Sequence, residues 1–106
     1  VLVSGWLTQG PAVPRFEQAL AARHATRHGI AVSNATAALH LACLALDIGP
    51  GSRVWTSPIS FVASANCARY CGAEVDFVDV DASTALMSVA ALEAKLADAA
   101  RAGRLP

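Results

Sequence analysis

Hydrophobic and polar positions along the chain alternate between two periods, one typical of helices and one typical of short buried strands. Pro14 suits the first turn of a helix, Ser88 suits an N-cap, and Gly72 suits a helix end. The pattern therefore predicts helices over about 15–26, 36–46, 61–70 and 88–101, and strands over 30–33, 53–56 and 74–80.

The alternation of strand and helix predicts an α/β fold, a mostly parallel sheet with covering helices. Parallel strands need a long crossover, and the predicted helices over 36–46 and 61–70 supply the two that three strands require. In open sheets of this kind, ligands bind beyond the carboxyl ends of the strands. We expect Asn34, Thr36 and the turn over 58–61 to lie at that edge.

The stretch over 32–46 reads as a strand that turns through small polar residues into a helix rich in alanine and leucine. A helix start leaves backbone N–H groups without intrahelical partners and carries a partial positive charge, so it can bind a phosphate. Asn34 suits the N-cap, Thr36 offers a hydroxyl, and Ala35 and Ala37 permit close approach. The residues alone leave simple capping open as the alternative, and Phe61 alone reads as a core aromatic.

Composition indicates a single small domain with surface that something else covers. The chain has 106 residues, of which 55% are hydrophobic and 15% charged, whereas a typical charged share is about 25%. Eight basic and eight acidic residues cancel, so we expect no nucleic-acid or anionic-membrane partner. Every apolar run is interrupted well short of the roughly 20 residues of a membrane span.

Other groups with possible chemistry favour structural roles. His24 and His28 have the spacing of two ligands on one helix, but no third ligand accompanies them, so we expect no metal. His40 is expected to pack, and Asp79 and Asp81 to end a strand and shape its turn. An odd count of three cysteines fits reduced thiols, with Cys67 and Cys71 as packing residues, and a cytoplasmic location.

Several stretches, in order along the chain, resemble the DegT/DnrJ/EryC1/StrS family of nucleotide-sugar aminotransferases: 6–11, 16–17, 31–40, 55–66 and 72–81. The likeness runs from about Trp6 to about Leu92. It implies the fold type I architecture of pyridoxal 5′-phosphate (PLP) enzymes, which resembles aspartate aminotransferase. Residues 1–106 would be the N-terminal part of the PLP-binding large domain, with the remainder of that domain and the C-terminal small domain absent.

The resemblance also implies an activity. The complete enzyme would move an amino group from glutamate to a UDP-linked 4-keto-6-deoxy sugar of the pseudaminic acid type, and would be a homodimer. The residues that the resemblance assigns to the PLP phosphate and ring are Ala35, Thr36, Ala37 and Phe61. Those that it assigns to the substrate are Thr8 and Gln9.

The lysine that carries PLP as a Schiff base in this family is expected beyond Pro106. The chain has one lysine, Lys95, on an expected surface helix that matches no lysine motif of the family. We therefore expect no catalytic residue in this chain and no activity from it alone. Two alternatives stay open: a PLP-dependent sugar dehydratase of the same family, with histidine in place of that lysine, and a noncatalytic remnant or interaction module.

Overall fold

The computed structural model describes residues 3–6, 8 and 10–106. The chain divides into two compact units, Val1–Ser33 and Asn34–Pro106. Among the described residues, the first unit carries helix α1, and the second carries a two-stranded sheet with helices α2, α3 and α4. Within this described part, no helix is both long enough and apolar enough to cross a membrane.

Helix α1 spans Ala12–Arg23 and begins after Pro11, earlier than the predicted start near residue 15. The helix ends as His24 leaves the helical conformation and Ala25 adopts a left-handed φ of 51°. His24 is therefore the C-cap and His28 lies beyond the helix. The two imidazoles do not share a helical face, which removes the geometry on which an i, i+4 metal pair depends.

The predicted strand over 30–33 is wrong, because no strand forms there in the described chain. The Ala31 N–H donates instead to Oε1 of Glu17, at 2.8 Å. Gly29 approaches α1 so closely that a Cβ would lie 2.6 Å from the carbonyl oxygen of Glu17. A strand needs a neighbour to complete its backbone hydrogen bonds, and this segment is held by α1 instead.

The second unit is built around a β–α–β motif. Helix α2 (Ala35–Ala45) precedes strand β1 (Arg53–Thr56), helix α3 (Ala63–Tyr70) and strand β2 (Glu74–Phe77). The strands are parallel, with Arg53 opposite Glu74 and Thr56 opposite Phe77. This confirms the predicted bounds of the strand over 53–56 and the parallel arrangement.

Strand β2 ends earlier than the predicted 74–80. Val78 still donates its N–H to the carbonyl oxygen of Thr56, at 2.9 Å. Beyond it, Val80 forms an isolated antiparallel bridge with Met87, which closes a loop.

Helix α4 (Val89–Arg101) then begins with Ser88 as its N-cap, whose Oγ accepts from the Ala91 N–H. The predicted cap and helix end are confirmed.

The turn after α3 shows why local sequence could place the helix end. Gly72 adopts a left-handed φ of 82°, which glycine tolerates without strain. Its N–H donates to the carbonyl oxygen of Arg69, and the Ala73 N–H donates to that of Ala68. These two bonds form a Schellman motif, which satisfies carbonyls at the helix end and leads the chain into β2.

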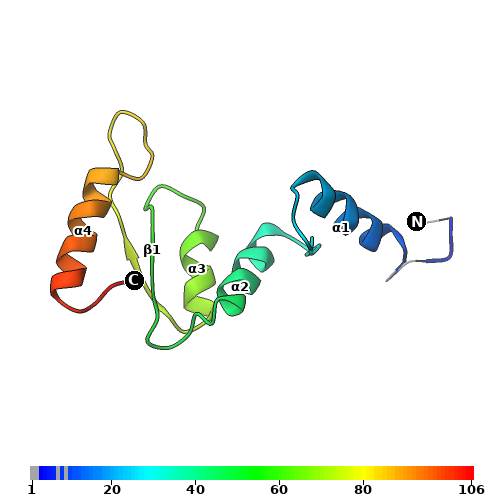
Figure 1. The fold of residues 1–106 in the computed structure, drawn as a ribbon, viewed down its shortest axis with the longest axis horizontal. Helices are drawn as coiled ribbons and strands as arrows, with labels where there is room; N and C mark the ends of the chain where they lie inside the picture. The colour runs from blue at the N-terminus through cyan, green and yellow to red at the C-terminus, as the bar shows by residue number, and fades with distance from the viewer. Residues whose placement is uncertain (1–2, 7, 9) are drawn as a thin grey trace. The chain divides into compact units, whose positions relative to one another are not determined.

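The sheet lies between α4 on one side and α3, with α2 behind it, on the other (Figure 1). Helix α3 packs on both strands, and α2 packs on α3. The buried side chains of the described residues all lie in this unit, and most are small: Ala63, Cys67, Ala68, Ala73 and Val78. Small residues let α3 approach the sheet closely, but they bury little apolar area.

The contact between α2 and α3 contains thiols and rings. His40 meets Tyr70 edge to face, with ring centroids 5.4 Å apart, which confirms a packing contact for His40. Cys67 is buried as predicted, and the cysteines are free thiols. Burial, followed by hydrogen bonding to Cys67, raises the pKa of the Cys43 thiol to about 11.

We expect Cys43 to resist alkylation in the folded chain at pH 8, because the thiolate is the nucleophile and the raised pKa keeps it scarce. Iodoacetamide labelling followed by peptide mass mapping measures this. The same reaction in denaturant is the control, since unfolding removes the burial. Equal labelling rates at Cys43 in the folded and denatured chain would contradict the expectation.

Candidate functional site

The start of α2 is a candidate anion-binding position. Asn34 is the N-cap, and its Oδ1 accepts from the Ala37 N–H at 2.9 Å. Ala35 and Thr36 occupy the preceding positions of the first turn, where N–H groups have no intrahelical acceptor. The Thr36 side chain is half-buried and the Ala35 side chain is exposed. Two amides, one hydroxyl and the positive end of the helix dipole can therefore meet a phosphate here.

The Asn34 cap changes the expected role of Ala37. The family resemblance assigns Ala37 to the PLP phosphate, whereas in the structure the Ala37 N–H donates to the Asn34 cap. A phosphate at this helix start would take the Ala35 and Thr36 donors first. Ala37 would contribute only by sharing its N–H with Asn34.

A small pocket of about 170 Å³ lies at the carboxyl ends of both strands. Its lining comes from β1 and the residues after it, from the first part of α3, and from β2: Thr56, Ser57, Pro58, Ser60, Phe61, Val62, Ser64, Ala65 and Phe77. Phe61 is 74% exposed, so it is not the core aromatic that its residue type alone suggests. An exposed ring beside hydroxyl groups can take a flat, polar ligand against its face.

The helix start and the Phe61 pocket belong to the same edge of the second unit. Helices α2 and α3 pack together, and Figure 1 shows both running in the same direction, opposite to the strands. The amino end of each helix therefore faces the side where the strands end. This arrangement matches the predicted place for a ligand in a parallel sheet.

Lys95 is held against the sheet and does not stand free on a surface helix. Its Nζ lies 2.6 Å from Oδ2 of Asp76 and 2.6 Å from the carbonyl oxygen of Phe77. The ammonium also lies 5.0 Å from the ring centroid of Trp55, within reach of a cation–π contact. These contacts could not be predicted from local sequence, because the partners come from strands distant along the chain.

We expect Lys95 to form no stable adduct with PLP in this chain. An amine must be neutral and free to attack a carbonyl, and this ammonium donates to Asp76 and to Phe77 instead. Incubation with PLP, borohydride reduction and mass mapping measures the label. Stoichiometric labelling of Lys95, together with turnover of a keto sugar by this chain, would contradict the expectation.

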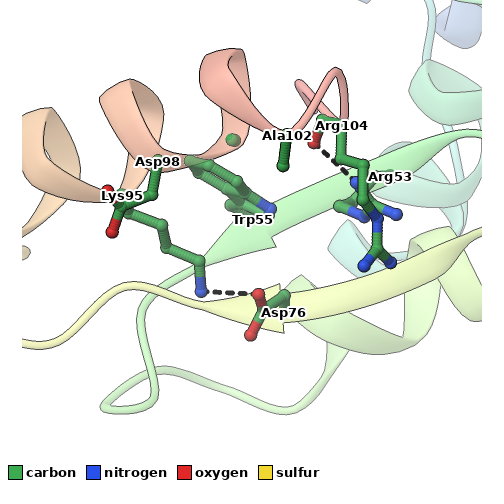
Figure 2. A pocket seen from close by; sticks show the side chains of 8 residues that line it. Arg53, Trp55, Asp76, Lys95, Asp98, Ala102 and Arg104 are labelled. Atoms are coloured by element: carbon green, nitrogen blue, oxygen red, sulfur yellow. Dashed lines mark hydrogen bonds and ion pairs between the residues drawn. The ribbon is translucent and has the colours of Figure 1, made fainter.

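A second pocket, a groove of about 270 Å³, lies between α4 and the sheet (Figure 2). Trp55 forms part of it, and its Nε1 is buried without a hydrogen-bond partner in the described structure. The charged groups that line this groove are largely paired: Arg53 with Glu74, and Lys95 with Asp76. Side chains alternate along a strand, so the groove lies on the opposite face of the sheet from the Phe61 pocket.

The acidic residues near β2 are structural, as predicted for the two that follow the strand. Asp81 Oδ1 accepts from the Ser83 hydroxyl and from the N–H groups of Ser83 and Thr84. The Ser83 hydroxyl bond, followed by these backbone bonds, lowers the pKa of the Asp81 carboxyl. The carbonyl oxygen of Asp79 accepts from the Ser88 N–H. Both residues shape the loop before α4.

The predicted substrate residues, Thr8 and Gln9, belong to the N-terminal segment of the chain. Thr8 is exposed in the first unit. Gln9 lies outside the described residues. Among the residues that the structure does describe, no cluster of histidine, cysteine, aspartate or glutamate has the geometry to hold a metal ion.

Solved structures place this arrangement in a class of proteins. A DegT/DnrJ/EryC1/StrS aminotransferase from Brucella abortus is 38% identical, with a TM-score of 0.86 over 99% of this chain and 28% of that protein. A Streptococcus pneumoniae protein described as a sugar aminotransferase, solved in PLP, PMP and apo forms, is 34% identical with a TM-score of 0.81. The fold is that of fold type I PLP aminotransferases, as expected.

The chain belongs to the DegT/DnrJ/EryC1/StrS aminotransferase family, whose sequence pattern matches residues 1–102. The spore coat polysaccharide biosynthesis protein SpsC of Bacillus subtilis is 45% identical over 93 residues. The UDP-4-amino-4-deoxy-L-arabinose–oxoglutarate aminotransferase of Shewanella sediminis is 40% identical over 93 residues. Each match covers 88% of this chain and 24% of the relative, so the chain spans about a quarter of their length. PLP is the cofactor of this family.

Proposed function

We propose that this chain is the N-terminal part of the PLP-binding large domain of a nucleotide-sugar aminotransferase. In the complete protein, the amino group of glutamate would pass to the keto carbon of a UDP-linked 4-keto-6-deoxy sugar. The name of the Shewanella sediminis relative, with its UDP-sugar and oxoglutarate, supports both halves of this reaction. The family match over residues 1–102 supports the reaction class.

One observation carries the proposal: the open start of α2 and the exposed Phe61 ring lie at the edge where the strands end. Ala35 and Thr36 would hold the PLP phosphate through their amides and the Thr36 hydroxyl, with Ala37 sharing its amide. Phe61 would support one face of the pyridine ring. When bound, PLP supplies an electron sink for the bonds at the amine carbon. Thr8 and Gln9 would contact the sugar substrate.

Within the family, we propose a sugar of the pseudaminic acid type, which makes the complete protein a UDP-4-amino-4,6-dideoxy-N-acetyl-β-L-altrosamine transaminase. The motifs over 6–11, 31–40 and 55–66 support this choice through their resemblance to that enzyme. We also propose a cytoplasmic homodimer. The high apolar content and low charge of the chain support a covered surface.

The DNA on both sides of the coding segment tests the proposal first. A continuous reading frame that carries the family's lysine motif supports an aminotransferase. Histidine at that position would indicate a dehydratase, and a stop codon a noncatalytic remnant.

Assay of the complete protein is the second test. It should convert glutamate to 2-oxoglutarate in the presence of PLP and a UDP-4-keto-6-deoxy sugar, in amounts equal to the amino sugar formed. Mass spectrometry of the sugar measures the exchange of a keto oxygen for an amine. Loss of a hydroxyl group without gain of nitrogen would overturn the transaminase assignment.

A further inference from the structure

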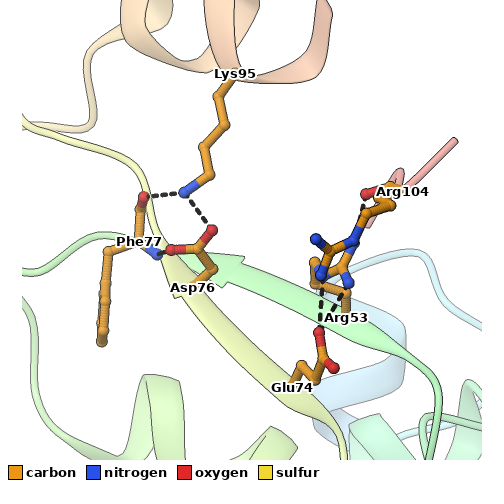
Figure 3. A network of polar contacts seen from close by, with 6 residues as sticks. All are labelled: Arg53, Glu74, Asp76, Phe77, Lys95 and Arg104. Atoms are coloured by element: carbon orange, nitrogen blue, oxygen red, sulfur yellow. Dashed lines mark hydrogen bonds and ion pairs between the residues drawn. The ribbon is translucent and has the colours of Figure 1, made fainter. Parts of the chain in front are cut away.

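The carboxyl end of β2 is held in place by an ion pair from α4. Lys95 Nζ donates to the carbonyl oxygen of Phe77 and pairs with Oδ2 of Asp76, each at 2.6 Å (Figure 3). Oδ1 of the same Asp76 accepts from the Phe77 N–H at 2.8 Å. Both backbone polar groups of Phe77 are therefore bound to one Lys95–Asp76 pair.

The ring of Phe77 points away from that pair. In Figure 3 its side chain extends from the backbone in the direction opposite to Lys95. There Phe77 lines the same pocket as Phe61 and Thr56. The ion pair thus binds the backbone of Phe77, and the side chain of Phe77 lines the candidate site.

We propose that Lys95 and Asp76 are positioning residues for the cofactor pocket: from the far face of the sheet they hold Phe77 so that its ring completes the wall beside Phe61. The inference rests on the proposed function, because it takes that pocket as the place of the PLP ring. Neither side chain touches the pocket, so both act through Phe77.

The contacts of Lys95 and Asp76 limit the movement of both side chains, as a positioning role requires. The Lys95 side chain is 27% exposed and lies over Trp55, which limits its freedom. The hydrogen bond from Lys95, followed by the backbone bond from Phe77, lowers the pKa of the Asp76 carboxyl, which favours the carboxylate that accepts both bonds. A charge-assisted hydrogen bond to a backbone carbonyl is stronger than a neutral one.

The same face of the sheet offers a matched control. Arg53 of β1 pairs with Glu74 of β2 at 2.8 Å, at the amino ends of the strands, and like Lys95 it also donates to a backbone carbonyl, that of Arg104, at 2.6 Å. Neither residue lines the Phe61 pocket. Substituting Arg53 therefore removes the Arg53–Glu74 ion pair from the sheet and leaves the hydrogen bonds of Phe77 in place.

The experiment compares Lys95→Met, Lys95→Arg, Asp76→Asn and Arg53→Met in the complete protein. We expect Lys95→Met to weaken PLP affinity by about three- to tenfold, to shift the absorbance maximum of bound PLP, and to speed hydrogen exchange at the Val78 amide. Lys95→Arg should restore part of the affinity because it keeps the charge. Asp76→Asn should have a smaller effect than Lys95→Met, since its amide oxygen still accepts from Phe77. Arg53→Met should leave affinity and absorbance unchanged.

The double variant Lys95→Met/Asp76→Asn should lose no more affinity than Lys95→Met alone, because the two residues act as a unit. Equal PLP affinity in Lys95→Met and Arg53→Met, with Phe61→Ala still impaired, would overturn the positioning role and leave the proposed site standing. Unchanged PLP affinity in Phe61→Ala would overturn the pocket assignment, and the positioning role with it.

Discussion

Phe61→Ala in the complete protein is expected to weaken PLP binding by about tenfold or more. Aromatic pairs contribute about 0.5–1.5 kcal/mol beyond their buried area, and the apolar contact of the ring is lost as well. Because Phe61 is 74% exposed in this chain, its truncation removes little packing within the second unit. Titration followed by the absorbance of bound PLP measures the affinity, and circular dichroism checks the fold.

Thr36→Val is the companion variant at the phosphate end. It keeps the shape of the side chain and removes a hydroxyl contact worth roughly 0.5–1.5 kcal/mol, which predicts a three- to tenfold loss of PLP affinity. Asp79→Asn is the control, because Asp79 belongs to the loop before α4 and should leave the affinity nearly unchanged. If Thr36→Val and Phe61→Ala both bind PLP as the unaltered protein does, the site lies elsewhere.

The second large effect concerns the 106-residue chain expressed alone, which we expect to form oligomers or aggregates. The buried side chains of its described part are few and mostly small. Large apolar residues remain exposed on α1, on α2 and near the pocket, among them Phe16, Leu41, Leu44, Leu46 and Phe61. In the described part of the chain, each strand also has only one neighbouring strand, so the outer edge of each is not covered by a further strand. Exposed apolar patches and open edges both favour association.

Light scattering coupled to size exclusion, together with binding of a hydrophobic dye, measures this association. Leu41 and Leu44 lie one turn apart on α2, about half exposed, so Leu41→Glu/Leu44→Glu should reduce both signals. Ala90→Glu/Ala94→Glu on α4 adds the same charge at exposed alanines and is the control. A monomer with a sharp, concentration-independent melt and no dye binding would refute the expectation.

Local features of the fold were predictable because each depends on a few neighbouring residues. Strand β1 has the predicted bounds. A short segment between turn residues on both sides has room for a strand but not for a helix, so its ends are fixed by its neighbours. Asn34 and Ser88 are N-caps that accept from amides three residues ahead, and Gly72 closes α3. The anion site proposed at the start of α2 rests on the same local rule, so its place on a helix start could be predicted from sequence, whereas phosphate binding there stays a prediction.

The strand expected over 30–33 shows where this reasoning stops. An apolar run specifies that a segment can be extended, but a strand exists only if a neighbour completes its hydrogen bonds. In the described chain, the Ala31 amide finds the carboxylate of Glu17 instead. The exposure of Phe61 is a second case, because residue type alone favours burial of a phenylalanine and only the packing around it decides otherwise.

By itself, the sequence determined the order of helices and strands from α2 onward, the N-caps Asn34 and Ser88, the turn at Gly72, and the family to which the chain belongs. Only the tertiary structure decided the contacts between elements that are distant along the chain. Lys95 reads as a surface lysine, yet it is bound to Phe77 and Asp76 because α4 lies against one face of the sheet there. Such contacts depend on how elements pack, and no local period or cap in the sequence encodes that packing.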